Sequence, residues 1–279
     1  MNAFLFPGQG SQHKGMGKDL LSDFKTLVGV ADEVLGYSIT ELCLEDPDGR
    51  LAQTRYTQPA LFVVSALTHL KHFEETNEEP AYLAGHSLGE YTALFVAGVF
   101  DFRTTLELVA KRGEVMSQAK EGGMAAIVGE GVEAIATLTA ERAPAIDVAN
   151  YNSDKQVVIS GPKDAIGDFT PNLEQRGFRV IPLKVSAAFH SRYMAEAREA
   201  FTAFLGTHTP QAPRIPVIAN VTAEPYPDDA AGIRQRLAEQ ITGSVHWVDS
   251  MRRLRALGVD TIIEQGPGQV LTRLWDAVS

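Results

Sequence analysis

The sequence of 279 residues predicts an α/β fold in which a large body carries a smaller inserted subdomain. Near both ends of the chain, short apolar runs alternate with helix-forming segments, which is typical of a largely parallel sheet with both faces covered. Between Gly122 and Val185 the order changes to strand, helix, strand, strand, helix, strand, which is a ferredoxin-like arrangement. We therefore expect residues 1–121 and 191–279 to form the body and residues 122–190 to form the subdomain.

The individual elements follow from apolar runs bounded by turn residues. In the body we expect strands at residues 3–6, 80–84, 215–219 and 259–263, and helices at residues 91–100, 229–241 and 247–257. In the subdomain we expect strands at residues 124–128, 145–149, 156–160 and 178–183, and helices at residues 131–142 and 163–176. A Gly-rich turn at residues 7–12 follows the first strand and is expected to lead into a helix. It lacks the GxxxxGK[ST] pattern of a phosphate loop.

Composition and charge exclude several classes of protein. A formal charge of -10 argues against nonspecific nucleic-acid binding, because phosphate contacts require clustered positive charge. Cys43 is the only cysteine and the histidines show no closely spaced ligand set, so we expect neither a disulfide nor a metal site. No apolar run reaches the roughly 20 residues that span a bilayer, and the N-terminus lacks the charged region of a signal peptide. We expect a cytoplasmic protein with no bound cofactor, no nucleic-acid partner and no membrane association.

The segment Gly85-His86-Ser87-Leu88-Gly89 matches the G-x-S-x-G pattern of a nucleophile elbow. An apolar run precedes it and a helix-forming run follows it, which is the order that such an elbow requires. The small glycines permit a sharp turn that projects the serine hydroxyl, and the next helix directs its first N–H groups toward the same place. The pattern predicts an α/β-hydrolase-like body with Ser87 as the nucleophile of an acyl transfer. An ordinary glycine-flanked turn is the alternative.

A nucleophilic serine needs a base, and His190 is the best candidate in the chain. It lies at the exit of the predicted subdomain, after the apolar pair Ala188-Phe189. This position would place the ring at the seam between subdomain and body, facing the elbow. Judged from these residues alone, a structural histidine remains the alternative.

Six motifs in the chain occur in the order of one known family. They are Pro7-Gly-Gln-Gly-Ser-Gln12, Gly85-His-Ser-Leu-Gly-Glu90, Lys111-Arg-Gly-Glu-Val-Met116, Asn152-Ser with Gln156-Val-Val-Ile-Ser-Gly161, Ala188-Phe-His-Ser191 and Gly266-Pro-Gly268. Together they resemble the malonyl-CoA:acyl carrier protein transacylases over essentially the whole chain. Within that family, Gly98-Val-Phe-Asp-Phe102 and Ser186-Ala-Ala-Phe-His190 are most similar to freestanding acyltransferases that serve modular polyketide synthases in trans.

The resemblance assigns roles to the catalytic candidates. It implies that Ser87 is the nucleophile, that His190 is its general base, and that the backbone N–H groups of Gln9 and Leu88 form the oxyanion hole. No cofactor is implied. The acyl group would be carried as a seryl ester between two thiols.

The resemblance also implies that a backbone carbonyl, in place of a carboxylate, orients the catalytic histidine. The matching position is His246, where the family commonly has glutamine. Because only a main-chain oxygen is involved, the substitution is expected to be tolerated. A hydrolase-type acid, either Asp249 or Asp260, is the alternative.

Substrate selection is implied to depend on Arg112. Its guanidinium can hold a carboxylate bidentately, and a malonyl group offers a carboxylate where acetyl and fatty acyl groups do not. Phe189 resembles the residue that narrows the pocket against an α-methyl group, and Gln58 and Asn152 match pocket-lining positions. The alternatives are a solvated helix face for Arg112, a core aromatic for Phe189 and simple backbone partners for the two amides.

The implied reaction takes malonyl from malonyl-CoA and gives it to the phosphopantetheine thiol of an acyl carrier protein. A local basic patch would help a carrier protein dock, and Arg252, Arg253 and Arg255 offer one, although a solvated helix face is also consistent with them. An acyl hydrolase acting on carrier proteins is the main alternative, but it has no use for Arg112. A noncatalytic carrier-binding module is the third class, and it would not need the elbow.

Overall fold

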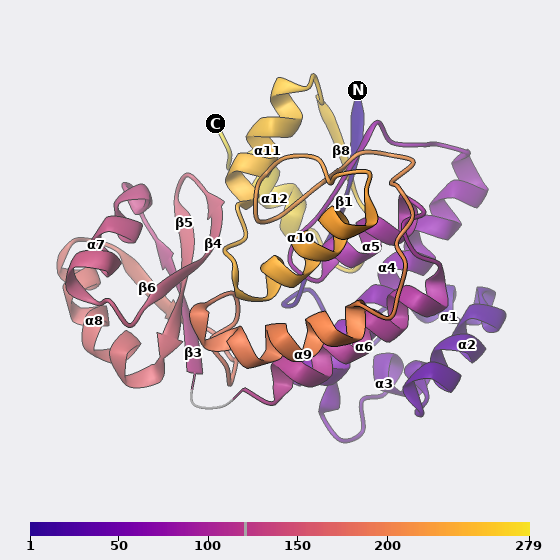
Figure 1. The fold of residues 1–279 in the computed structure, drawn as a ribbon, viewed down its shortest axis with the longest axis horizontal. Coiled ribbons are helices and arrows are strands. Elements are labelled where there is room, and N and C mark those ends of the chain that lie inside the picture. The colour runs from indigo at the N-terminus through magenta and orange to yellow at the C-terminus, as the bar shows by residue number, and fades with distance from the viewer. Residues whose placement is uncertain (120–121) are drawn as a thin grey trace.

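The computed structural model describes residues 1–119 and 122–279 and places their strands in two separate four-stranded sheets (Figure 1). One sheet has the order β7-β2-β1-β8, and the other has the order β4-β5-β3-β6. Helices cover both sheets, so the predicted α/β class is confirmed. The boundary expected between residues 121 and 122 adjoins residues 120–121, which lie outside the described residues. The division of the chain at 121/122 and 190/191 stays a prediction.

The first sheet is parallel throughout and occupies the body. Its strands are β1 (Asn2–Phe6), β2 (Tyr82–Gly85), β7 (Val217–Ile218) and β8 (Thr261–Glu264). Along β1 the side chains alternate between the two faces: Phe4 and Phe6 belong to one apolar cluster, and Ala3 and Leu5 belong to another. All four are fully buried, because helices cover both faces of the sheet.

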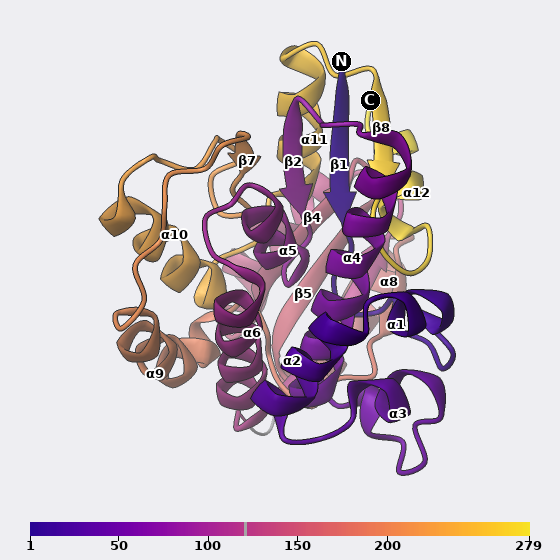
Figure 2. The same cartoon turned by 90° about the vertical axis from the view of Figure 1, so that its right-hand side faces the viewer.

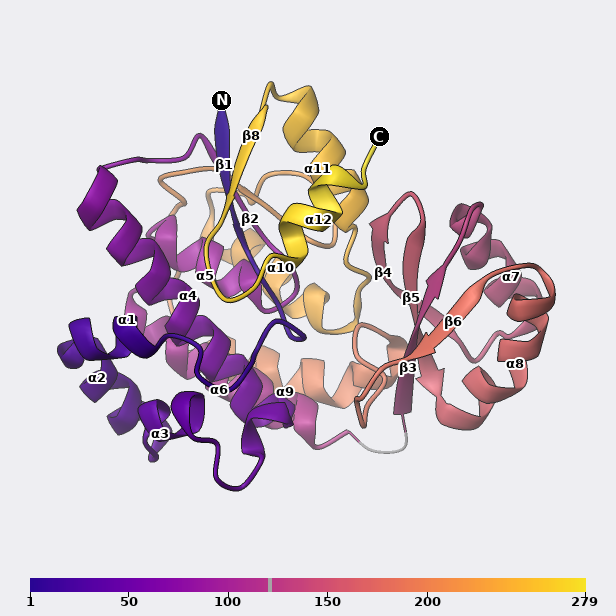
Figure 3. The same cartoon turned by 180° about the vertical axis from the view of Figure 1, so that it is seen from behind.

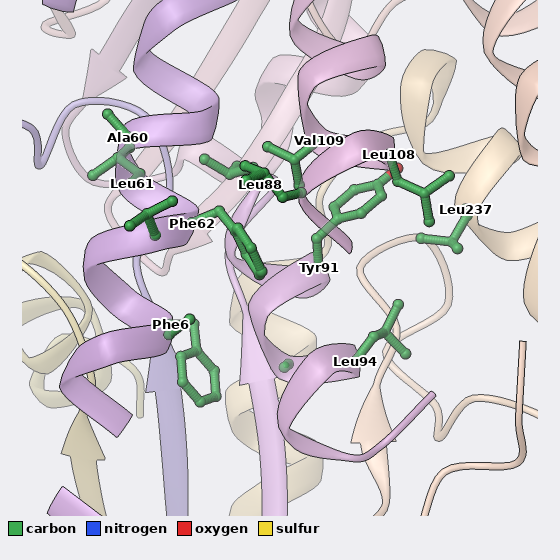
Figure 4. Packing of buried hydrophobic residues seen from close by; sticks show 14 of the residues in the cluster. Phe6, Ala60, Leu61, Phe62, Leu88, Tyr91, Leu94, Leu108, Val109 and Leu237 are labelled. Atoms are coloured by element: carbon green, nitrogen blue, oxygen red, sulfur yellow. The ribbon is translucent and has the colours of Figure 1, made fainter. Parts of the chain in front are cut away.

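The helices of the body divide between these two faces. Helices α4, α5 and α6 contribute to the cluster of Phe4 and Phe6, whereas α11 and α12 contribute to the cluster of Ala3 and Leu5 (Figures 2 and 3). Figure 4 shows Phe6 beside Phe62 of α4, with Leu94 of α5 on the other side of the same cluster. The helices are α1 (Lys18–Asp23), α2 (Lys25–Leu35), α3 (Ile39–Leu44), α4 (Thr54–Thr76), α5 (Gly89–Val96), α6 (Phe102–Ser117), α9 (Ala195–Leu205), α10 (Ala230–Thr242), α11 (Trp247–Ala256) and α12 (Val270–Asp276).

The second sheet is antiparallel and has the predicted ferredoxin-like order. Its elements are β3 (Gly122–Val128), α7 (Ile135–Arg142), β4 (Asp147–Ser153), β5 (Gln156–Pro162), α8 (Lys163–Gln175) and β6 (Arg179–Pro182). Helices α7 and α8 share one apolar cluster with the sheet and lie on one side of it (Figure 1). The strand expected at 145–149 begins later, because Ile146 N donates to Ala143 O in a turn that follows α7.

Strand β4 also joins the second sheet to the body. Asn150 forms an isolated parallel bridge with Val245, the residue two positions before α11. Val245 N donates to Ala149 O at 2.8 Å, and Tyr151 N donates to Val245 O at 2.9 Å. These bonds hold the polar residues of β4 next to the chain that leads from α10 to α11.

The Gly-rich turn at residues 7–12 does not lead directly into a helix, since α1 begins only at Lys18. The turn itself packs beside the elbow, because a Cβ on Gly8 would lie only 2.4 Å from His86 O. Among the helices of the described residues, none combines the length and the apolar character needed to cross a membrane.

Candidate active site

Ser87 lies on a tight turn between β2 and α5, as the elbow pattern predicts. Its φ angle is +51°, a left-handed conformation that costs a non-glycine residue about 1 to 3 kcal/mol. The flanking glycines make the turn possible: a Cβ on Gly85 would lie 1.9 Å from the Gly89 carbonyl carbon, and one on Gly89 would lie 1.9 Å from Phe6 O. The sequence needs glycine on both sides because the turn folds back on itself at Gly85 and packs against the backbone of β1 at Gly89.

His190 and Ser87, which are 103 residues apart, meet at 2.7 Å between Nε2 and Oγ. The other ring nitrogen, Nδ1, lies 2.9 Å from Gln240 O and 3.1 Å from Gly243 O. Carbonyl oxygens only accept, so Nδ1 carries the proton and the Nε2 lone pair faces the serine hydroxyl. Burial, together with the charge of Arg112 and the proximity of His86, lowers the pKa of His190 to about 3. The ring is therefore neutral near pH 7 and is able to accept the serine proton.

The prediction that the backbone carbonyl of His246 orients His190 is wrong. His246 caps the N-terminus of α11, so its carbonyl accepts from Ser250 N at 3.0 Å and from Ser250 Oγ at 2.8 Å within that helix. Its ring stacks on Tyr151, with 5.2 Å between centroids, near the surface. The carbonyls of Gln240 and Gly243, at the end of α10, take the orienting role.

The carboxylates considered as alternatives also lie elsewhere. Asp249 pairs with His246 at 3.4 Å, and Asp260 pairs with the N-terminal ammonium group at 3.1 Å. Neither contacts His190. The serine and histidine thus form a pair oriented by main-chain oxygens.

The residues predicted to form the oxyanion hole lie at the nucleophile. Gln9, in the Gly-rich turn, and Leu88, which follows the nucleophile, both line the cavity at Ser87. Within residues 1–119 and 122–279, neither N–H donates a hydrogen bond. The N–H of Ser87 itself is occupied by Asn220 Oδ1 at 2.7 Å. The oxyanion hole of Gln9 and Leu88 stays a prediction, and both residues lie where it requires them.

Arg112 brings a buried positive charge to the nucleophile. Its side chain is only 1% exposed, and Nη2 lies 3.2 Å from Ser87 Oγ. The guanidinium donates to Gln58 Oε1 at 2.6 Å and to Gln240 Oε1 at 2.9 Å, both uncharged acceptors. No carboxylate in the described part of the chain forms a salt bridge with it. A buried guanidinium without a counterion favours a ligand that carries its own carboxylate.

The cavity at Ser87 has a volume of about 110 Å³, which is small beside pockets that hold drug-sized ligands. Its polar lining consists of Gln9, Thr54, Gln58, His86, Ser87, Arg112, Asn150 and His190. Its apolar lining consists of Leu88, Met116, Met124, Leu183, Val185 and Phe189. The polar groups surround the nucleophile, so the site suits a short acyl group with a charged end.

The structure places Gln58 and Phe189 in this lining, as expected, but not Asn152. Asn152 Oδ1 lies 2.9 Å from His86 Nε2, so its amide is used to hold that ring. Asn150, two residues earlier on β4, reaches the cavity in its place. Asn152 thus lies behind His86 at an irregular part of β4, with register shifts on either side of Tyr151, and a substrate contact for it stays a prediction.

Sequence reasoning missed three buried polar residues beside the elbow, and all three contact each other or Ser87. Asn220 Nδ2 donates to Gly85 O at 2.7 Å, and Asn220 N donates to Glu90 Oε1 at 2.9 Å. Gln240 Nε2 donates to Ser87 O at 2.8 Å and also to the carboxylate of Glu90. Glu90 lies inside the elbow motif, but nothing in that motif indicates its partners.

No group of histidine, cysteine, aspartate or glutamate side chains in the described ranges could hold a metal ion.

Fold and site together define an acyltransferase. A family model for the acyl transferase domain matches residues 3–274, and the chain belongs to this family. The predicted enzyme class is therefore confirmed.

Two relatives in polyketide pathways are similar over nearly their whole length. The chain is 49% identical over 277 residues to the polyketide biosynthesis malonyl CoA-acyl carrier protein transacylase PksC of Bacillus subtilis, covering 98% of this chain and 96% of PksC. It is 50% identical over 279 residues to BaeC of Bacillus velezensis, which has the same description, covering 98% and 95%. It also matches the polyketide biosynthesis protein ThaF of Burkholderia thailandensis at 49% identity but spans only 24% of that protein.

Solved structures agree with these matches. A malonyl CoA-acyl carrier protein transacylase from Burkholderia pseudomallei superposes with a TM-score of 0.94 at 46% identity, over 99% of this chain and 97% of that one. A malonyl-transacylase in complex with a type II polyketide acyl carrier protein, PlMCAT:AntF, superposes with a TM-score of 0.94 at 35% identity, covering 99% and 92%. The resemblance inferred from the six motifs is confirmed.

Proposed function

We propose that this chain is a malonyl-CoA:acyl carrier protein transacylase that works in trans for a polyketide synthase. The observation that carries the choice of acyl group is the guanidinium of Arg112, which is buried, has no carboxylate partner in the described residues and lies 3.2 Å from Ser87 Oγ. The polyketide assignment is supported by the similarity to PksC and BaeC. The carrier protein as acceptor is supported by the complex of the similar transacylase PlMCAT.

The geometry accounts for the first half of the reaction. Ser87 Oγ attacks the thioester carbonyl of malonyl-CoA while its proton passes to His190 Nε2, 2.7 Å away. The carbonyl oxygen becomes an oxyanion that the N–H groups of Gln9 and Leu88 stabilise. When the C–S bond breaks, the proton on His190 moves to the departing CoA sulfur, and malonyl remains as an ester of Ser87.

The second half runs in reverse with another thiol. The phosphopantetheine thiol of the carrier protein gives its proton to His190 and attacks the ester carbonyl. The same oxyanion hole serves, and the proton returns to Ser87 as the C–O bond breaks. Each half conserves the proton, so the cycle needs no added oxidant, reductant or cofactor.

Arg112 and Phe189 are proposed to set selectivity. A malonyl carboxylate would pair with the guanidinium, whereas a neutral acyl group would leave that charge buried and unpaired. Phe189 lines the same cavity and would oppose an α-methyl group. One methyl group is worth about 1 to 3 kcal/mol, so malonyl over methylmalonyl is proposed as a preference.

The docking patch predicted on α11 is less available than its sequence implies. Arg252 pairs with Asp154, Arg253 pairs with Glu224, and Arg255 donates to the backbone carbonyls of Trp275 and Val278. Carrier binding through these arginines therefore stays a prediction. We also propose that the protein is cytoplasmic, because CoA thioesters are made and used in the cytoplasm.

Intact-mass spectrometry after brief exposure to malonyl-CoA tests the proposal. The wild-type protein should gain one malonyl group and lose it to a phosphopantetheinylated carrier protein, and Ser87→Ala should gain nothing. A Ser87→Ala variant that still gained malonyl would overturn the nucleophile. Dominant release of free malonate in the presence of ample carrier protein would favour the hydrolase instead.

A further inference from the structure

Gln240, on α10, contacts every charged or reacting group of the site. Its backbone oxygen accepts from His190 Nδ1 at 2.9 Å, and its side-chain Nε2 donates to Ser87 O at 2.8 Å. The same Nε2 donates to the carboxylate of Glu90, and Oε1 accepts from Arg112 Nη2 at 2.9 Å. The residue is fully buried. One residue thus connects the base, through its backbone, with the nucleophile and the guanidinium, through its side chain.

The orientation of this amide is fixed by its partners. Arg112 has only donors, so the amide oxygen must face it. The backbone oxygen of Ser87 accepts, so the amide nitrogen must face that side. A flipped amide would oppose donor to donor and acceptor to acceptor in a buried place, where such mismatches are costly.

Glu90 is the acidic group nearest to this arrangement, yet it does not pair with Arg112 directly. Its carboxylate is fully buried and accepts from Asn220 N at 2.9 Å and from Gln240 Nε2. Tyr226 also faces it. Burial raises the pKa of Glu90 to about 7, although the hydrogen bonds and the charge of Arg112 act in the other direction. An uncharged amide therefore stands between a buried acid and a buried guanidinium.

We propose that Gln240 is the specificity-positioning residue of this enzyme: it holds Arg112 beside Ser87 while separating it from Glu90, so that the guanidinium stays unpaired for the carboxylate of the incoming acyl group. A direct ion pair with a protein carboxylate would occupy the two N–H donors of the guanidinium that a malonyl carboxylate needs. Neutral hydrogen-bond acceptors orient the guanidinium without competing for its charge. This inference builds on the malonyl-transfer function proposed above.

The substitution Gln240→Glu tests the separation by placing a carboxylate against Arg112 in a side chain of the same size. The observable is the ratio of kcat/KM for Ser87 loading from malonyl-CoA to that from acetyl-CoA. The ratio should fall by about tenfold or more, through a higher KM for malonyl-CoA, while acetyl loading is kept or rises. If Gln240 were needed only for folding, the substitution would lower kcat/KM for malonyl-CoA and for acetyl-CoA equally. The ratio of the two would then stay unchanged.

A matched control lies on the same helix. Gln235 is exposed and makes the same kind of amide contact, donating to Glu239 Oε1 at 2.8 Å. Gln235→Glu adds the same charge to α10 away from the cavity, so it should keep the wild-type ratio. Equal drops in the ratio for both variants would overturn the proposal, because general charge on α10 would then explain the effect.

Gln240→Glu alone places a second carboxylate beside that of Glu90 and could fail to fold. A double variant therefore provides a second test of the role of Gln240. Glu90→Gln combined with Gln240→Glu exchanges acid and amide, keeps the net charge and restores a donor between the two positions. The double variant should also lose the malonyl preference by about tenfold or more. A folded double variant with the wild-type ratio would refute the role of Gln240.

The two levels of proposal fail differently. If the wild-type protein loads no malonyl on Ser87, the proposed function is wrong. If the wild-type protein loads malonyl and the Gln240→Glu variants retain its preference, only the role of Gln240 is wrong.

Discussion

Asn220 is predicted to hold the nucleophile elbow in its strained shape. Its amide bridges the turn, accepting from Ser87 N at 2.7 Å and donating to Gly85 O at 2.7 Å. Asn220→Ala would leave both backbone groups buried without partners. Each such group costs about 1 to 3 kcal/mol, so the variant should lose about 2 to 6 kcal/mol in the free energy of unfolding. Loading of Ser87 should also slow by roughly 100-fold, since a displaced nucleophile no longer meets His190.

Urea unfolding and single-turnover malonyl loading measure the two effects. Asn172→Ala, which removes an exposed hydrogen bond to Arg176 on α8, provides the control and should change neither quantity. A variant at Asn220 whose free energy of unfolding stayed within about 0.5 kcal/mol of the wild-type value would refute the reasoning.

Asn220→Asp sharpens the same test. One carboxylate oxygen could still accept from Ser87 N, but the other would face the carbonyl oxygen of Gly85. Protonation of the carboxyl restores a donor there, so the deficit in stability relative to the wild type should shrink as the pH falls. A deficit independent of pH would mean that the contact with Gly85 contributes little.

Three further predictions concern the charged groups of the site. His190→Ala should slow malonyl loading by about 100- to 10,000-fold, whereas His246→Ala should have little effect, because the ring that it removes stacks on Tyr151 and does not contact His190 or Ser87; equal losses in a stopped-flow loading assay would contradict this assignment. Arg112→Ala should lower malonyl loading and keep or raise acetyl loading, and an unchanged acyl preference in competition assays would exclude the guanidinium as the selector. Glu90, whose pKa is raised to about 7 by burial, stabilises the fold below pH 4.5 relative to higher pH, and this stabilisation is lost as the pH rises through about 7. As the pH rises from below 4.5 to above 7, the free energy of unfolding of Glu90→Gln should therefore increase by about 3 kcal/mol relative to that of the wild type. If urea unfolding gave the same difference between the two proteins at every pH in this range, Glu90 would not titrate as inferred.

The fold could be predicted because its signals are local. The apolar runs at residues 3–6 and 80–84 become β1 and β2, and the strand-helix order between residues 122 and 185 gives the second sheet directly. The ends of strands are harder to predict where apolar residues continue into a turn. The late start of β4 at Asp147 is one example: Pro144 marks the turn that follows α7, but the apolar residues Ala145 and Ile146 read as part of the strand.

The catalytic groups could be predicted only in part. Ser87 is marked by the two glycines that its turn requires, so its place follows from the sequence. His190 was a candidate from its position at the exit of the predicted subdomain, with a structural histidine as the alternative, and Arg112 was indicated only by the resemblance to a family. The resemblance also placed the orienting carbonyl at His246, whereas Gln240 and Gly243 take that role, because the sequence does not mark which carbonyls at the end of α10 face the ring.

Asn220 and Gln240 escaped prediction for a different physical reason. Each contacts Ser87 across a long stretch of sequence, 133 residues for Asn220 and 153 residues for Gln240. In a sequence, an asparagine or glutamine looks the same whether it bridges an active site or a loop. What distinguishes them is the pairing of donors and acceptors, which exists only once β7 and α10 are packed beside α5. The elbow supplies a strained serine and the guanidinium supplies a charge, but neither is held in place by its own segment. On the proposal made above, the selectivity of the site would depend on uncharged amides that orient both groups while leaving the positive charge open to the substrate.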